Sequence, residues 1–175
     1  MDYDLDKAIR KIPDFPKPGI LFYDITGILT LPEAFRECMN QIISLYKDEK
    51  FDAVAAVESR GFVFAAPLAL ALGLPLLLVR KQGKLPGKVL SRSYSLEYGK
   101  SVLEVKPEDV PLGGNVLLVD DLLATGGTLK AAAELLEEAG ALVKDVFCVV
   151  GLPFLNPAQK LEGRRIRTLI DYHGE

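Results

Sequence analysis

Short apolar runs alternate along the chain with segments in which apolar residues recur at helical spacing. Four runs have the length and composition of buried strands: residues 53–57, 74–79, 116–119 and 146–150. Helical spacing follows Pro32 as far as Tyr46 and returns over residues 61–72 and 128–139. Because strands that alternate with helices are typical of βαβ units, we predict an α/β fold with a mostly parallel twisted sheet flanked by helices.

Two stretches do not fit this alternation: the Pro-rich residues 14–25 and the polar, Gly-studded residues 82–105. Ligands of open α/β sheets bind beyond the carboxyl ends of the strands, where such segments can form covers. We therefore expect a single domain over residues 1–175, with a small hood from about residues 1–30 and a mobile lid loop at about residues 82–105.

Residues 61–79 carry no charge over a length that could span a membrane. Pro67, Gly73 and Pro75 divide this segment into a helix and a strand, and a helix packed beside a buried strand has the same composition. We therefore predict no membrane span.

The overall charge limits the classes of partner. With 21 Lys and Arg against 24 Asp and Glu, the net charge is -3. This balance excludes a general attraction to nucleic acid, so basic clusters must act locally on a small anion. Cys38 and Cys148 lie in apolar patterns without a nearby CxxC, and we expect buried free thiols in a reducing, cytoplasmic setting.

Residues 116–128 carry the clearest candidate chemistry, because a buried strand leads through two carboxylates into a small-residue turn that opens a helix. Free N–H groups at a helix start attract an anion, and Gly126 and Gly127 let the anion approach the main chain. The hydroxyl groups of Thr125 and Thr128 add donors. This pattern predicts a phosphate site.

Asp120 and Asp121 would repel that phosphate at close range, so we expect them to accept hydrogen bonds from hydroxyl groups attached to it, as in a ribose. Two alternatives are an ordinary capped turn and a nucleotide hydrolase. A P-loop is excluded because Tyr94 stands where the first Gly before Gly99-Lys100-Ser101 belongs.

Two further segments carry cations where strands are predicted to end. Ser59 and Arg60 follow the strand at residues 53–57, and Arg80, Lys81 and Lys84 follow the strand at residues 74–79. Taken alone, these are typical of a capped helix and of a solvated charged surface. Their position at strand ends favours contact with a second, larger anion.

The stretch at residues 116–128 resembles the phosphoribosyl-pyrophosphate-binding motif of the phosphoribosyltransferases, and residues 95–100 resemble the mobile catalytic loop of the adenine phosphoribosyltransferases. The similarity extends from residue 14 to about residue 155 and implies the type I fold of that family. It implies that the 5′-phosphate and ribose are bound by Asp120, Asp121, Ala124, Thr125, Gly126, Gly127 and Thr128. It implies that the pyrophosphate is bound by Ser59, Arg60, Arg80, Lys81 and Lys84. The resemblance also implies that Glu97, Tyr98, Asp120 and Asp121 are catalytic. In this assignment Glu97 handles the purine proton and Tyr98 helps to close the site.

The resemblance also implies that Leu21, Tyr23 and Leu152 line the base site. It implies transfer of a phosphoribosyl group from phosphoribosyl pyrophosphate to adenine, with Mg²⁺ held mainly by substrate oxygens, in a homodimer. Tyr23 stands where the family usually has Arg, and Gly151 where Glu is frequent. A 6-oxopurine substrate therefore stays open as an alternative. A sensor that regulates transcription is a second one, although the first 50 or so residues lack a basic recognition helix. His173 is expected at the surface.

Overall fold

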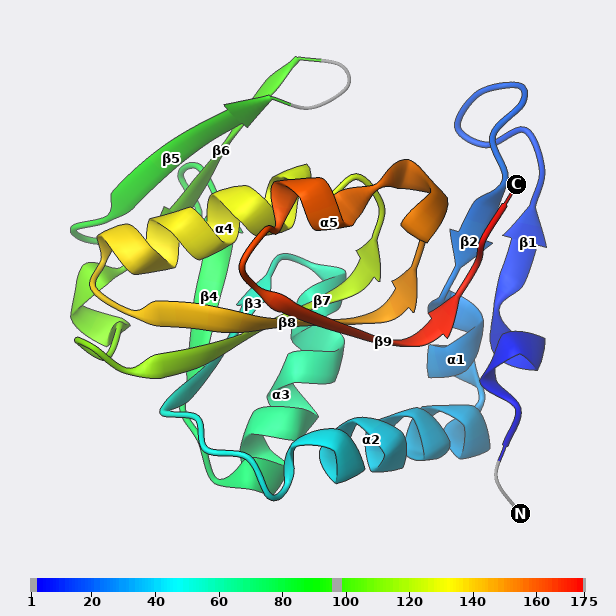
Figure 1. Ribbon diagram of the computed structural model, residues 1–175, viewed down its shortest axis with the longest axis horizontal. Helices are drawn as coiled ribbons and strands as arrows, with labels where there is room; N and C mark the ends of the chain where they lie inside the picture. The colour runs from blue at the N-terminus through cyan, green and yellow to red at the C-terminus, as the bar shows by residue number, and fades with distance from the viewer. Residues whose placement is uncertain (1–2, 96–98, 175) are drawn as a thin grey trace.

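The computed structural model describes residues 3–95 and 99–174. Within them a seven-stranded sheet has the order β5-β6-β4-β3-β7-β8-β9 (Figure 1). Its strands are β3 (Ala53–Val57), β4 (Leu76–Lys81), β5 (Leu90–Ser95), β6 (Lys100–Val105), β7 (Asn115–Leu123), β8 (Leu142–Gly151) and β9 (Arg165–Asp171). From β4 to β9 through β3, β7 and β8, neighbouring strands are parallel. The predicted mostly parallel sheet is confirmed.

Helices cover both faces of this sheet (Figure 1). One face packs against α2 (Pro32–Tyr46) and α3 (Arg60–Leu72), with α1 (Thr26–Thr30) beside them. The other packs against α4 (Gly127–Glu138), and the short α5 (Pro157–Lys160) lies next to α4. Short 3₁₀ turns complete the chain: η1 (Leu5–Ala8), η2 (Pro107–Asp109) and η3 (Pro153–Leu155).

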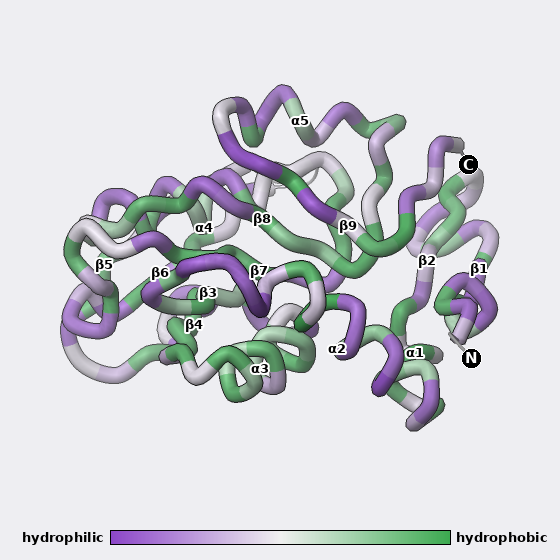
Figure 2. The backbone as a smooth tube through the Cα atoms, turned by 60° about the horizontal axis from the view of Figure 1, so that its bottom comes forward, coloured by the Kyte–Doolittle hydropathy of each residue, from purple (hydrophilic) through white to green (hydrophobic). Residues whose placement is uncertain are grey.

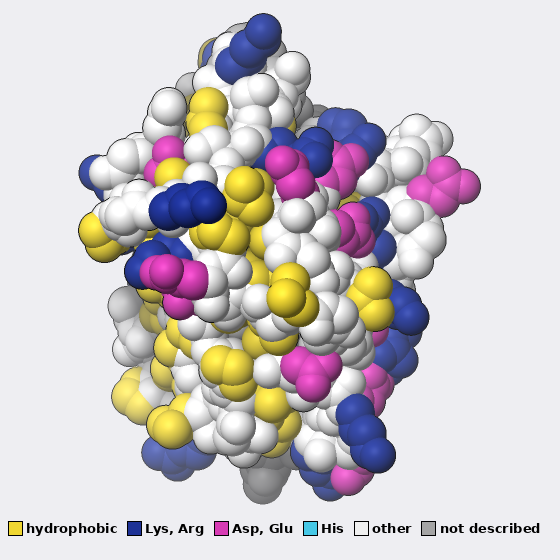
Figure 3. All heavy atoms as spheres, turned by 90° about the vertical axis from the view of Figure 1, so that its left-hand side faces the viewer, with side chains coloured by type: hydrophobic (Ala, Val, Ile, Leu, Met, Phe, Trp, Pro, Cys, Tyr) yellow, Lys and Arg dark blue, Asp and Glu magenta, His cyan; other side chains and the backbone are white. Residues whose placement is uncertain are grey.

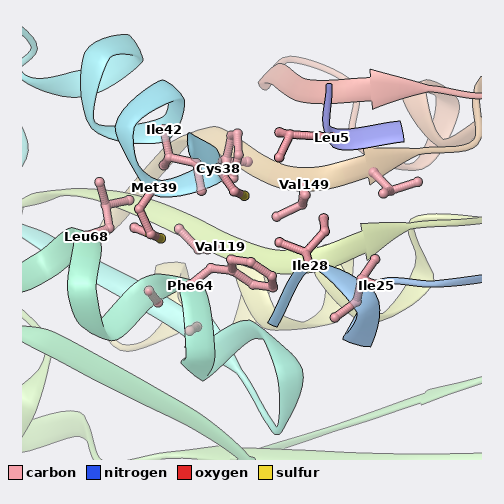
Figure 4. Close-up of a cluster of buried hydrophobic side chains, with 14 of the residues drawn as sticks. Leu5, Ile25, Ile28, Cys38, Met39, Ile42, Phe64, Leu68, Val119 and Val149 are labelled. Carbon is pink, nitrogen blue, oxygen red and sulfur yellow. The ribbon is translucent and has the colours of Figure 1, made fainter. Parts of the chain in front are cut away.

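Side chains of β7 alternate between the two covered faces. Leu117 and Val119 pack in the cluster under α2 and α3, whereas Val116 and Leu118 pack in the cluster under α4. A strand buried on both faces must be apolar at every position, which explains its unbroken apolar run. Figure 2 shows the central strands as mainly hydrophobic, and Figure 4 shows Val119 facing Phe64 and Ile28 in the first cluster.

The segment for which a hood was predicted, about residues 1–30, contains a two-stranded antiparallel ribbon of β1 (Arg10–Ile12) and β2 (Phe22–Asp24). In Figure 1 the C-terminal segment runs beside this ribbon. The first cluster joins the ribbon region to the sheet, since Tyr23 of β2 and Ile9 before β1 are buried with Val150 and Leu152. Hood and sheet therefore share one core.

Two strands extend further than predicted. β4 continues to Lys81 and β7 to Leu123, so Arg80, Lys81, Asp120 and Asp121 lie within strands and not after them. The ladder is formed by main-chain groups, which pair whatever the side chain, and Asp120 is paired with Cys148 of β8.

The prediction of a loop at residues 82–105 was wrong for most of its length. β5 and β6 form an antiparallel hairpin, and β6 joins the sheet by pairing with Arg80 and Lys81 of β4. Arg92 of β5 also forms ion pairs with Glu134 and Glu138 of α4 at 3.1 Å each. The hairpin is thus anchored at its base and along one side.

No helix among the described residues combines the length and the apolar character that crossing a membrane requires. The helix at residues 60–72 ends at Gly73, as the sequence predicted. Cys38 and Cys148 are buried free thiols, which confirms that expectation.

Candidate active site

A cavity of about 430 Å³ opens where β3, β4 and β7 end and α3 and α4 begin. It brings together all seven residues predicted for the 5′-phosphate and ribose and three of the five predicted for the pyrophosphate. The lining residues are Val57, Glu58, Ser59, Arg60, Lys81, Tyr94, Ser101, Leu103, Asp120, Asp121, Leu122, Leu123, Ala124, Thr125, Gly126, Gly127, Thr128 and Leu129. The carboxyl-end location agrees with the general rule for open α/β sheets.

The start of α4 forms one end of this cavity. The main chain turns at Gly126, whose φ is 78°, and no side chain caps the helix there. The first N–H groups of α4 therefore have no partner within the helix, and its dipole places partial positive charge at the same point. Thr125 and Thr128 line the cavity beside them. This arrangement suits a phosphate group.

The two carboxylates are in different environments. Asp121 is buried and forms an ion pair with Arg60 Nε, while its own N–H donates to Asp120 Oδ1 at 2.9 Å. Burial raises the pKa of Asp120 well above the usual range for a carboxyl group, and the charge of Asp121 adds to this rise. Asp121 therefore has a cationic partner, and Asp120 is the acid whose pKa is raised.

Ser59 lies immediately before α3, as predicted, but its side chain makes no capping hydrogen bond. The Glu58–Ser59 peptide bond is cis. Gly61, in the first turn of α3, has no room for a side chain, because a Cβ atom there would lie 3.0 Å from both Asp120 Oδ1 and the Val119 carbonyl oxygen. Glycine thus lets α3 begin directly against the acidic end of β7.

The basic residues predicted to bind pyrophosphate at the end of β4 differ in whether they line the cavity. Arg80 donates to Glu58 Oε2 at 3.3 Å and to the Lys84 carbonyl oxygen at 3.2 Å, and it is not among the described residues that line the cavity. Glu58 also accepts the N–H of Lys81. Lys81 lines the cavity, and Lys84 is exposed in the turn beyond β4. Arg80 thus braces this turn against Glu58.

The predicted base residues lie outside this cavity. Tyr23 is buried and stacks on Tyr172 with a ring-centroid distance of 3.9 Å. Leu21 is partly buried against the first core cluster. Leu152 is connected to the cavity, because its N–H donates at 2.9 Å to the carbonyl oxygen of Leu123, a cavity-lining residue. The structure therefore places Leu152 next to the cavity and turns the Tyr23 ring toward the C-terminal segment.

The two predicted lid residues, Glu97 and Tyr98, lie outside the described residues, so their roles stay predictions. The flanking Ser95 and Lys100 are paired at the end of the β5–β6 hairpin. His173 is exposed, as expected.

Sequence reasoning missed Lys160 of α5. Its Nζ lies 3.8 Å from the point that a Cβ atom at Gly127 would occupy, so the ammonium group reaches the start of α4. Pro157 of the same helix packs against Gly126 and holds α5 there. Within residues 3–95 and 99–174, no ion pair occupies Lys160. The chain around residue 160 offers no motif that would have revealed this contact.

Among the residues that the structure describes, no three His, Cys, Asp or Glu side chains gather as a metal-binding group. The cavity does hold the carboxylate oxygens of Asp120 and Asp121, which are donors of the kind that Mg²⁺ accepts. The donor chemistry thus fits a magnesium ion that brings most of its ligands with a phosphorylated substrate.

Residues 24–164 match the phosphoribosyl transferase domain family. The adenine phosphoribosyltransferase of Treponema denticola is 58% identical over 174 residues, which cover 99% of this chain and 92% of that protein. The crystal structure of adenine phosphoribosyltransferase from Thermoanaerobacter pseudethanolicus has a TM-score of 0.92 at 46% identity, covering 96% of this chain and 98% of that one. The enzyme from Giardia lamblia, solved in complex with 9-deazaadenine, has a TM-score of 0.89 at 36% identity, covering 98% and 97%.

Proposed function

This chain belongs to the phosphoribosyl transferase family, and from that premise we propose that it transfers the 5-phosphoribosyl group of phosphoribosyl pyrophosphate to adenine, which yields AMP and pyrophosphate. It is a pentosyltransferase of purine salvage. The observation that carries this proposal is the single cavity in which the carboxylates of β7, the open start of α4 and the cations of α3 and β4 converge. Adenine is proposed as the substrate because the relatives similar to this chain are adenine phosphoribosyltransferases.

The phosphate end of the substrate is assigned to the start of α4. Residues 124–128 would hold the 5′-phosphate through main-chain N–H groups and the Thr125 and Thr128 hydroxyls, and Lys160 would add a charge-assisted contact. Asp120 and Asp121 would accept hydrogen bonds from the two ribose hydroxyl groups and oppose the positive charge that develops at the anomeric carbon.

The leaving group is assigned to the cations that α3 and β4 contribute to the cavity lining. As the bond between the anomeric carbon and the pyrophosphate oxygen breaks, negative charge grows on the pyrophosphate, and Arg60, Lys81 and Ser59, which line the cavity, would stabilise it. Arg80 would act mainly by holding the main chain, because it donates directly to the Lys84 carbonyl oxygen and pairs with Glu58, which accepts the Lys81 N–H. Lys84 is exposed and extends the same positive surface.

Glu97 and Tyr98 are assigned to the incoming base. A purine nitrogen must lose its proton as it bonds to the anomeric carbon, and the Glu97 carboxylate would accept that proton. Tyr98 would help to exclude water from the site. Leu21, Tyr23 and Leu152 form the proposed base wall. Since the Tyr23 ring faces Tyr172, position 23 would contribute its main chain, which agrees with adenine binding despite the missing Arg.

A magnesium ion is the proposed cofactor. When bound, it would neutralise charge on the pyrophosphate of the substrate, and Asp120 and Asp121 are the residues whose oxygens fit it, directly or through water. We assign no other metal ligand in this chain.

We also propose a single domain with a hood and a lid, a homodimer and a cytoplasmic location. Exposed apolar side chains support association, among them Val63 and Leu70 of α3 and Leu78 of β4. Figure 3 shows hydrophobic side chains between charged ones on the side that carries the β5–β6 edge of the sheet. The buried free thiols suit a reducing compartment.

The proposed reaction is tested by incubating the protein with adenine, phosphoribosyl pyrophosphate and Mg²⁺ and separating the products by chromatography. AMP and pyrophosphate should appear in equal amounts. Turnover of phosphoribosyl pyrophosphate to ribose 5-phosphate without AMP would refute the transfer to a base.

A further inference from the structure

The two positions at which this chain departs from the family pattern, Tyr23 and Gly151, are joined by one segment. Asp171 is the register partner of Gly151 at the ends of β9 and β8, and the next residue, Tyr172, stacks on Tyr23. Figures 1 and 2 both place the C-terminal segment beside β2. Tyr23 and Gly151 are therefore both in contact with the same C-terminal segment.

Asp171 explains the glycine. A Cβ atom at position 151 would overlap Asp171 Oδ1 and lie 2.9 Å from Thr168 Cγ2. Asp171 Oδ1 is held in this place by the Thr168 hydroxyl, which donates to it at 2.7 Å. Any side chain at position 151, including the Glu that is frequent in the family, would therefore require Asp171 to move.

Tyr172 ties the sheet to the hood. Its N–H donates at 3.0 Å to the carbonyl oxygen of Gly151, the residue before Leu152. Its ring lies nearly parallel to that of Tyr23, at 15°, and its hydroxyl donates to Asp6. Lys11 of β1 places its ammonium group 5.0 Å from the ring centroid. Beyond it, the Tyr23 hydroxyl donates to the Gly174 carbonyl oxygen at 3.1 Å.

We infer that Tyr172 is a positioning residue for the base, because it fixes the hood strand β2 relative to Leu152. This inference rests on the proposed function, in which the base lies between Leu21 and Tyr23 of the hood and Leu152 of the sheet. The sugar-phosphate site is built from β7, α3 and α4 and does not involve the hood. Loss of Tyr172 therefore weakens binding of the base and leaves phosphoribosyl pyrophosphate binding intact.

The test compares Tyr172→Ala with Tyr172→Phe in steady-state kinetics with both substrates. An aromatic pair with its hydrogen bond accounts for about a tenfold change in affinity, so Tyr172→Ala should raise the KM for adenine about tenfold. The KM for phosphoribosyl pyrophosphate should change less than about twofold. Tyr172→Phe keeps the stack and should raise the adenine KM by about threefold at most. Tyr3→Ala, which removes another tyrosine packed against the same core, is the control.

Equal rises in both KM values, or no rise in the adenine KM, would overturn the inference. Should Tyr172→Ala not fold, Gly151→Ala gives a second test, because its methyl group displaces Asp171 and thereby Tyr172. Gly151→Ala should raise the adenine KM, and Gly151→Ala/Asp171→Gly should restore it; failure of this rescue also counts against the inference. A wild-type protein that turns over no adenine would refute the proposed function instead.

Discussion

Arg60, at the start of α3, forms an ion pair with Asp121 of the neighbouring strand β7. The carboxylate side chain is 6% exposed and the guanidinium side chain 49%, so the acid is held in the protein while the cation faces the cavity. The pair thus links the proposed ribose acceptor to the proposed pyrophosphate donor. A substrate that carries both a ribose and a pyrophosphate can therefore contact Asp121 through the ribose and Arg60 through the pyrophosphate.

Asp121→Asn should therefore reduce kcat/KM for phosphoribosyl pyrophosphate by about 10- to 100-fold, the range for losing a hydrogen bond to a charged group. The matched control is Asp145→Asn on β8, which also removes a buried carboxylate paired with an arginine, Arg165, away from the cavity. Comparable losses of kcat/KM in both variants would attribute the effect to stability and not to the ribose.

Replacing Asp120 should increase the stability of the protein while it lowers activity. Burial raises its pKa in the folded protein, and a raised acid pKa gives stability that is complete below the unfolded pKa and lost as the pH rises through the folded pKa. Asp120→Asn should therefore raise the Tm of the ligand-free protein at pH 7 and lower activity. The gain in Tm should vanish below about pH 4, where the unfolded acid is also protonated. Thermal scans across pH check this, and a lower Tm at pH 7 would contradict the assigned pKa direction.

Glu97→Gln tests the proposed proton acceptor. A carboxamide keeps the shape of the side chain but cannot take the purine proton, so kcat should fall by about 10²- to 10⁴-fold. The KM for phosphoribosyl pyrophosphate should be nearly unchanged, because the ribose and phosphate sites are built elsewhere. Single-turnover measurements separate chemistry from product release. A kcat near the wild-type value would exclude Glu97 as the base.

Lys160 should contribute to binding of the 5′-phosphate. We expect Lys160→Gln to weaken binding of ribose 5-phosphate by about threefold to tenfold, and Lys160→Arg to retain most of the affinity. Pyrophosphate binding should be unaffected in both. Lys144→Gln, an exposed lysine on β8, is the control. Isothermal titration with each ligand distinguishes the two subsites, and a loss confined to pyrophosphate would place Lys160 at the other end of the cavity.

The sheet, its flanking helices and the gathering of residues 120–128 at one cavity were predictable because local signals specify them. Unbroken apolar runs mark strands buried on both faces, and the small-residue turn at residues 124–128 marks the helix start. The ends of β4 and β7 were not predictable, since main-chain pairing continues through Arg80 and Asp120 despite their charge.

Contacts between distant segments were also beyond sequence reasoning. Tyr23 pairs with Tyr172, and Lys160 approaches Gly127, through the packing of whole elements and without a pattern in either segment. Arg80 was predicted to contact the pyrophosphate, and its partner Glu58 is identified only when β3 and β4 lie side by side.

Pyrophosphate release from phosphoribosyl pyrophosphate with Mg²⁺, measured with adenine, hypoxanthine, guanine and xanthine under identical conditions, tests the central claim most directly. We predict release with adenine alone, with Tyr23 and Gly151 tolerated because Tyr172 stacks on Tyr23 and binds the Gly151 carbonyl oxygen, which holds β2 beside Leu152. Release with a 6-oxopurine and not with adenine would contradict the assigned substrate while keeping the mechanism. Silence with every base, despite tight binding of phosphoribosyl pyrophosphate, would contradict the assignment as an enzyme.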